Sequence, residues 1–135
     1  MANRDMYSSV GTYAYEKLIA GTLPPVKVGS GTIRKLGTAD TLKRGTILAK
    51  SSGSAGDGKL VILGTSAATN ETLTPDCILT DDVEVGTSAD VKAPVYVMGD
   101  FNVDAVIVAT GYTITEDDKD ALRQRNIYFG YVADV

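Results

Sequence analysis

Short apolar runs separated by turn residues recur along the chain, and this pattern predicts β-strands rather than long helices. The run at 59–63, for example, is rich in branched apolar residues and stops at Gly64. We expect strands at 26–28, 32–36, 46–50, 59–63, 77–80, 93–98, 103–108 and 127–132. Turns are expected between them at Gly29-Ser30-Gly31, at 81–84 and at 99–102.

One segment near the C-terminus follows a helical pattern instead. Thr115 is a good N-cap, and Asp118, three residues later, completes a box-like arrangement. Acidic side chains fill the first turn and basic side chains the last, as the helix dipole favours. We therefore expect a helix over 116–125, ended by Asn126. Residues 13–20 could add one short turn of helix, after which Pro24-Pro25 favours an extended path.

Composition agrees with a mainly β single domain. The chain has 135 residues, of which 44% are hydrophobic, and this is enough for one modest core. Its 14 glycines suit many short strands joined by tight turns. No apolar stretch resembles a signal peptide or approaches the roughly 20 residues of a membrane span. These features predict a soluble intracellular protein.

The side chains offer little for catalysis. The chain has no histidine, which removes the commonest general base and imidazole metal sites. Cys77 is the single cysteine, and we expect it to be a buried apolar residue. The acidic clusters at 81–84 and 116–120 lack the spacing of a calcium loop. Asp100 and Asp104 could pair for acid–base work, but a structural role in a turn is favoured. We expect no enzyme, metal site or cofactor.

One stretch resembles the start of a phosphate-binding P-loop, because Gly53 is followed five and six residues later by Gly58 and Lys59. A P-loop continues with Ser or Thr and then a helix, whereas here Leu60 follows and a strand is expected. We interpret the stretch as a hairpin loop with its tight corner at Asp57-Gly58. The Gly29-Ser30-Gly31 segment is no dinucleotide motif either, since Arg34 stands where a third glycine is needed.

Charged side chains are distributed unevenly along the chain. Residues 1–50 carry eight basic and three acidic side chains, a balance of +5, whereas residues 51–135 carry five basic and fourteen acidic ones. A basic leader could contact nucleic acid or an acidic protein surface such as a neighbouring subunit, or it could be an ordinary solvated face. Tyr7, Tyr13 and Tyr15 could stack on bases, but they do not alternate with basic residues.

The order of several segments resembles the head decoration proteins of tailed bacteriophages, the group typified by the lambda decoration protein D. These segments are "LKRGTILAK", "GKLVILG", "TPDCILTDDV", "APVYVMGDFN" and "ATGYTITEDDKDALRQRNIYFG". The likeness covers about residues 40–135. "YEKLIAG" and the Pro-Pro leader resemble the N-terminal arm of longer family members.

The resemblance implies a small β-clip-like domain at 41–135 with one short helix near the C-terminus, preceded by an extended N-terminal arm at 1–40. It implies a homotrimer on the outer surface of the virion capsid, made in the host cytoplasm, that binds the major capsid protein and cements the expanded shell against DNA pressure. It implies no catalytic residue, no cofactor, no membrane and no direct nucleic-acid contact. The arm residues expected to contact the capsid are Tyr13, Tyr15, Leu18, Ile19, Pro24, Pro25 and Val26.

The alternative to this interpretation is a small nucleotide- or nucleic-acid-binding module. It would use the Gly53–Lys59 loop together with the basic leader.

Overall fold

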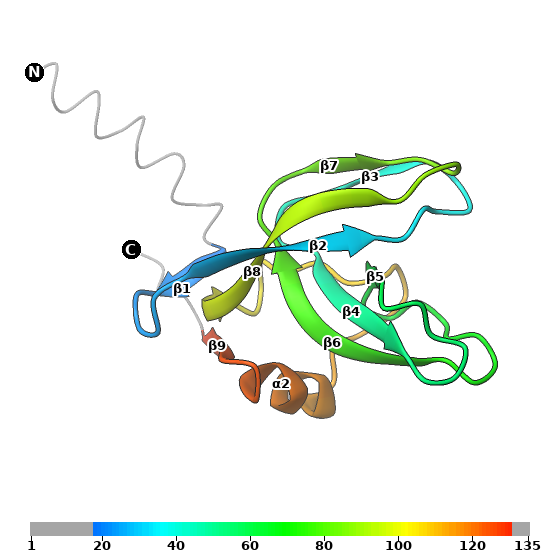
Figure 1. Ribbon diagram of the computed structural model, residues 1–135. Coiled ribbons are helices and arrows are strands. Elements are labelled where there is room, and N and C mark those ends of the chain that lie inside the picture. Colours follow the sequence, from blue (N-terminus) through cyan, green and yellow to red (C-terminus); the bar gives the residue numbers. More distant parts are fainter. Residues whose placement is uncertain (1–17, 131–135) are drawn as a thin grey trace, which may run out of the picture.

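One long strand, β8 (Val91–Asn102), organises the fold. In the computed structural model, which describes residues 18–130, β8 pairs with four other strands (Figure 1). Its first part, from Val91 to Met98, pairs with β2 along one edge, and Val95 and Tyr96 also pair with β6. Its last part pairs with β1 and β9. Every one of these pairs joins residues that are distant in sequence. Through its pairs with β1 and β9, β8 holds both ends of the described chain in the sheet.

Five strands close into a barrel-like ring. The ring runs from β8 through β2, β5, β4 and β6 and back to β8, where Ile78 pairs with Tyr96 and Leu79 with Val95. All pairs in the ring are antiparallel except β2–β5, which is parallel and joins Ile33 to Leu60. The ring strands other than β8 are β2 (Lys27–Ile33), β4 (Ile47–Ser52), β5 (Leu60–Ile62) and β6 (Thr72–Leu79).

The remaining elements cover this ring. β3 (Asp40–Leu42) and β7 (Val83–Val85) form a separate antiparallel ribbon. β1 (Ile19–Gly21) and β9 (Ile127–Gly130) extend the sheet at the far end of β8, and α2 (Glu116–Arg123) lies beside β6 and β9 (Figure 1). Within residues 18–130, no helix has the length and apolar character needed to cross a membrane.

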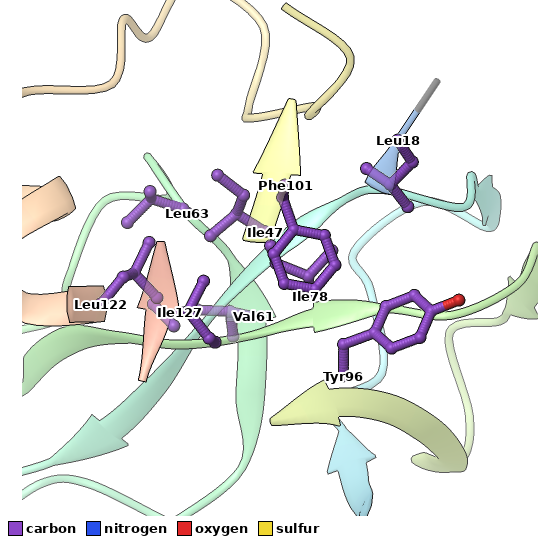
Figure 2. Packing of buried hydrophobic residues seen from close by; sticks show 10 residues of the cluster. Leu18, Ile47, Val61, Leu63, Ile78, Tyr96, Phe101, Leu122 and Ile127 are labelled. Carbon is purple, nitrogen blue, oxygen red and sulfur yellow. The ribbon is translucent and has the colours of Figure 1, made fainter. Parts of the chain in front are cut away.

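Two hydrophobic clusters lie on opposite faces of the ring strands. Neighbouring residues of a strand point to opposite faces, so Ile47 and Ala49 join one cluster while Leu48 joins the other. The helix-side cluster includes Leu122 of α2 and Ile127 of β9 (Figure 2). The ribbon-side cluster includes Leu42 and Val85 of the β3–β7 ribbon. Both faces are buried at Ile47, Leu48 and Ala49, which explains why this part of β4 is a continuous apolar run without a polar alternation.

Several expectations are confirmed. The molecule is mainly β with one short helix near the C-terminus. α2 has Thr115 as its N-cap, with a complete capping box to Asp118, but it ends at Arg123, two residues earlier than predicted, and the left-handed Asn126, with a φ of 68°, follows the turn after it. The 46–50 and 59–63 runs form the antiparallel pair β4 and β5. Cys77 is buried at 0% exposure.

Two turn assignments were wrong. β8 continues through 99–102, because β1 and β9 pair with this stretch, and the chain turns only at 103–105. The expected strand at 103–108 is therefore absent apart from one bridge between Thr46 and Ile107. Gly29-Ser30-Gly31 lies inside β2, which is one strand rather than two. A Cβ on Gly31 would lie 2.4 Å from Leu60 Cδ1, so this glycine allows close packing instead of a turn.

Two smaller assignments also changed. The acidic turn expected at 81–84 is shorter than predicted, because Val83 and Glu84 belong to β7. The expected helical turn at 13–20 falls mostly outside the described residues, and its last part, from Ile19, belongs to β1.

Candidate functional surface

The connection between β1 and β2 projects from the sheet. Both strands run antiparallel to β8, with Gly21 opposite Asp100 and Lys27 opposite Met98. Only Gly99 separates these two partners on β8, whereas residues 22–26 separate Gly21 from Lys27. The longer segment cannot fit the ladder and must leave the sheet, and it forms the loop seen between β1 and β2 (Figure 1). We call residues 22–26 the β1–β2 loop.

Apolar side chains gather on this loop and the strands beside it. Leu23 is 83% exposed, Val28 56%, Val26 41% and Ile19 37%. Only two other large hydrophobic side chains in residues 18–130 are exposed to this degree, Ile107 and Tyr128. Single exposed apolar residues need no explanation, but four of them within ten residues of chain make this segment a candidate interaction surface.

The base of this surface is firmly attached to the core. Leu18 is 3% exposed and belongs to the helix-side cluster with Phe101 (Figure 2). Its carbonyl oxygen accepts a hydrogen bond of 2.7 Å from the Asn102 amide. At the other end of the loop, Val26 lies against Gly99 of β8. The loop is thus held at both ends by the same strand.

The predicted arm residues fall into three groups. Tyr13 and Tyr15 lie outside the described residues. Leu18 is buried in the core, so its side chain does not join the exposed surface. The remaining four are exposed or half-buried, and they are Ile19, Pro24, Pro25 and Val26. The predicted arm at 1–40 is described from Leu18 onward, where it forms β1, the loop and β2 and enters β3 at Asp40.

Sequence reasoning missed Leu23 and Val28. Leu23 directly precedes the selected Pro24-Pro25 pair, and Val28 lies two residues after the selected Val26. An apolar residue beside a proline pair at a strand boundary is the signal that could have identified Leu23. Val28 carried no such signal, because an expected strand residue is normally buried on one face.

The Gly53–Lys59 loop does not have the arrangement of a phosphate cradle. Lys59 Nζ lies 2.5 Å from Asp90 Oδ2, and β5 follows directly at Leu60. A P-loop lysine instead faces phosphate from the start of a helix. Asp57 at the corner accepts two hydrogen bonds from Arg34, of 3.0 Å from Nε and 2.9 Å from Nη2. Gly58, the predicted corner glycine, has a φ of 74°.

A hydrogen-bonded network joins this loop to the next one. Arg34 Nη2 also donates to Glu71 Oε2 at 2.5 Å, and the buried Ser51 hydroxyl donates to the same oxygen. The pKa of Asp57 is lowered to about 2, chiefly by the Arg34 hydrogen bonds. The pKa of Glu71 is also lowered to about 2, by the Ala68 amide, Ser51 and Arg34. Arg34 of the basic leader is therefore engaged within the protein.

The other candidate groups also serve the fold. Arg44 Nη1 donates to the Thr80 carbonyl and the Tyr96 hydroxyl, each at 2.8 Å. Burial raises the pKa of the Cys77 thiol, which disfavours a reactive thiolate. Asp100 lies on β8 and Asp104 in the turn that follows it. In the described part of the chain, no group of three or more His, Cys, Asp or Glu side chains is placed to hold a metal ion.

Comparison with known proteins gave one family match. The model of the family described as "Bacteriophage lambda head decoration protein D" matches residues 9–128, which is most of the chain. A search of curated proteins found no match.

Proposed function

The chain belongs to the bacteriophage lambda head decoration protein D family, and on that premise we propose that it binds the outside of the expanded phage capsid as a homotrimer. There it cements the shell formed by the major capsid protein against the pressure of packaged DNA. The family's structural role on the phage head supports this proposal. We further propose the β-clip classification, production in the host cytoplasm and the absence of cofactor, membrane and direct nucleic-acid contact.

The observation that carries this proposal beyond the family match is the apolar surface around the β1–β2 loop. A protein that decorates a shell needs a surface that contacts the shell subunit, and the exposed Ile19, Pro25 and Val26, with the half-buried Pro24, supply apolar groups for it. Tyr13 and Tyr15 would add contacts from the N-terminal arm. An arm that pairs its main chain with the shell subunit gains hydrogen bonds but loses conformational freedom.

A trimer compensates for a weak individual contact. Once one copy is bound, the other two are held near their own sites, so overall binding can exceed the affinity of one site by about 100-fold or more. A modest apolar surface on each copy can therefore suffice on a large particle. Weakening each copy slightly should strongly weaken the binding of the trimer to the head.

Co-sedimentation with expanded empty phage heads tests the proposal. The full chain should pellet with the heads and saturate, and light scattering should give the mass of a trimer. A matched chain lacking residues 1–17 should bind more weakly while its circular dichroism melt stays close to that of the full chain. The proposal fails if the full chain stays in the supernatant at saturating concentration.

The nucleotide- or nucleic-acid-binding alternative has little support from the geometry, because Lys59 pairs with Asp90 and β5 replaces the required helix. Titration with fluorescent ATP and with DNA at moderate salt should give no saturable signal. Saturable binding that Lys59→Ala abolishes would favour the alternative.

A further inference from the structure

We propose that the β1–β2 loop is a preformed anchor, with Leu23 at its centre, that inserts into an apolar depression on the capsid shell subunit in addition to any contact made by residues 1–17. This inference rests on the proposed function, since it assumes that the shell is the partner. It adds a contact from the folded domain, and it names Leu23 and Val28, two residues that are absent from the predicted capsid-contacting set.

The exposure of Leu23 is the first support. With 83% of its surface exposed, Leu23 leaves more of itself in water than any other large apolar side chain in residues 18–130. Val28 follows at 56% and lies just beyond the loop on β2. Burying these side chains against a partner would recover the free energy that their exposure costs.

The second support is that the fold fixes both ends of the loop. Ile19 pairs with Phe101 and Gly21 with Asp100 before the loop, and Lys27 pairs with Met98 after it. Short connections fixed at both ends lose little conformational freedom on binding. A contact held in this way can therefore contribute affinity at a small ordering cost.

The position of the chain ends favours the shell as occupant over a second copy. Residues 1–17 join the domain at Leu18, directly before β1, and Gly130 at the end of β9 lies beside Ala20. Residues 1–17 therefore join the domain at the base of the loop, on the edge from which the loop projects. Both segments would reach the same partner surface. Two linked contacts on one partner reinforce each other through effective concentration.

The test compares two matched variants of the full chain. Leu23→Ser removes the exposed leucine of the loop, and Ile107→Ser removes another exposed apolar residue, 40% exposed, that lies outside the β1–β2 region. Binding to expanded empty heads is measured by co-sedimentation over a concentration series. Leu23→Ser should raise the Kd by at least about 10- to 100-fold, which is the change expected for one fully buried leucine and a lower bound for a trimer that binds through three copies, whereas Ile107→Ser should change it less than about twofold. Leu23→Ser should keep the circular dichroism melt of the unchanged chain, whereas Ile107→Ser, which loses a side chain that is more than half buried, should stay folded with a lower Tm.

Each outcome decides the inference. If Leu23→Ser binds heads as tightly as the unchanged chain, the anchor is overturned and the proposed function stands. Loss of the trimer in Leu23→Ser, seen by light scattering without heads, overturns it in favour of contact with a second copy. An equal loss of head binding in both variants overturns it as well. If the unchanged chain itself does not bind heads, the proposed function fails and the anchor fails with it.

Discussion

The attachment of α2 provides the sharpest test of how the core is built. Leu122 is the only buried residue of this helix, at 0% exposure, and it packs in the helix-side cluster with Leu63 and Ile127 (Figure 2). Leu122→Ala would remove that contact and leave a cavity. Buried Leu→Ala changes cost about 2–5 kcal/mol, and alanine is the better helix former, so helix propensity cannot account for the loss.

A cost of about 3 kcal/mol should lower the Tm by roughly 10 °C in a domain of this size. Circular dichroism melts at one fixed protein concentration measure it, because self-association would otherwise shift the Tm. Arg123→Ala is the control, since Arg123 is the next residue and only pairs with Asp120 on an exposed face. A drop below about 2 °C for Leu122→Ala, or one equal to that of the control, would show that α2 does not depend on this contact.

Two further predictions concern the loops. Asp57 and Glu71 have folded-state pKa values of about 2, below the ordinary carboxyl value near ~4, so their stabilisation is present above that value and is lost as the pH falls toward 2. Urea unfolding between pH 6 and pH 2.5 should show this decline, and Arg34→Ala should make it shallower; an unchanged slope would contradict the assignment. Gly64→Ala should lower the Tm by several degrees, because Gly64 has a φ of 101° and an added Cβ would lie 2.5 Å from Tyr112 Cγ. An unchanged melt would mean that the Tyr112 segment moves freely.

Local chemistry was sufficient to predict several elements. α2 begins after Thr115 because that hydroxyl accepts a hydrogen bond from the Asp118 amide, an interaction within four residues of chain. The loop before Lys59 was predicted because a strand-like run lies on each side of it, whereas a P-loop requires a helix after the lysine. In both cases the deciding residues are neighbours in sequence, so the pattern alone was informative.

Prediction failed where distant partners decide the conformation. Residues 99–102 contain a glycine and an asparagine and resemble a turn, yet β1 and β9 hold them in the sheet. Gly31 also resembled a turn residue, but it makes room for Leu60, which is far away in sequence. The candidate surface follows the same rule. The apolar and proline residues near position 24 could be selected from the sequence, whereas the exposure of Leu23 and the burial of Leu18 could not.

The sequence by itself determined a mainly β domain, the capped helix and the absence of histidine chemistry, because these depend on composition and on contacts between near neighbours. The tertiary structure decided that five strands close into a ring, that Leu18 enters the core and that residues 22–26 project from the sheet. The physical reason is register. Which residues stand opposite one another on β8 is fixed by the packing of the whole core, and residues 22–26 leave the sheet because Gly99 alone lies opposite them.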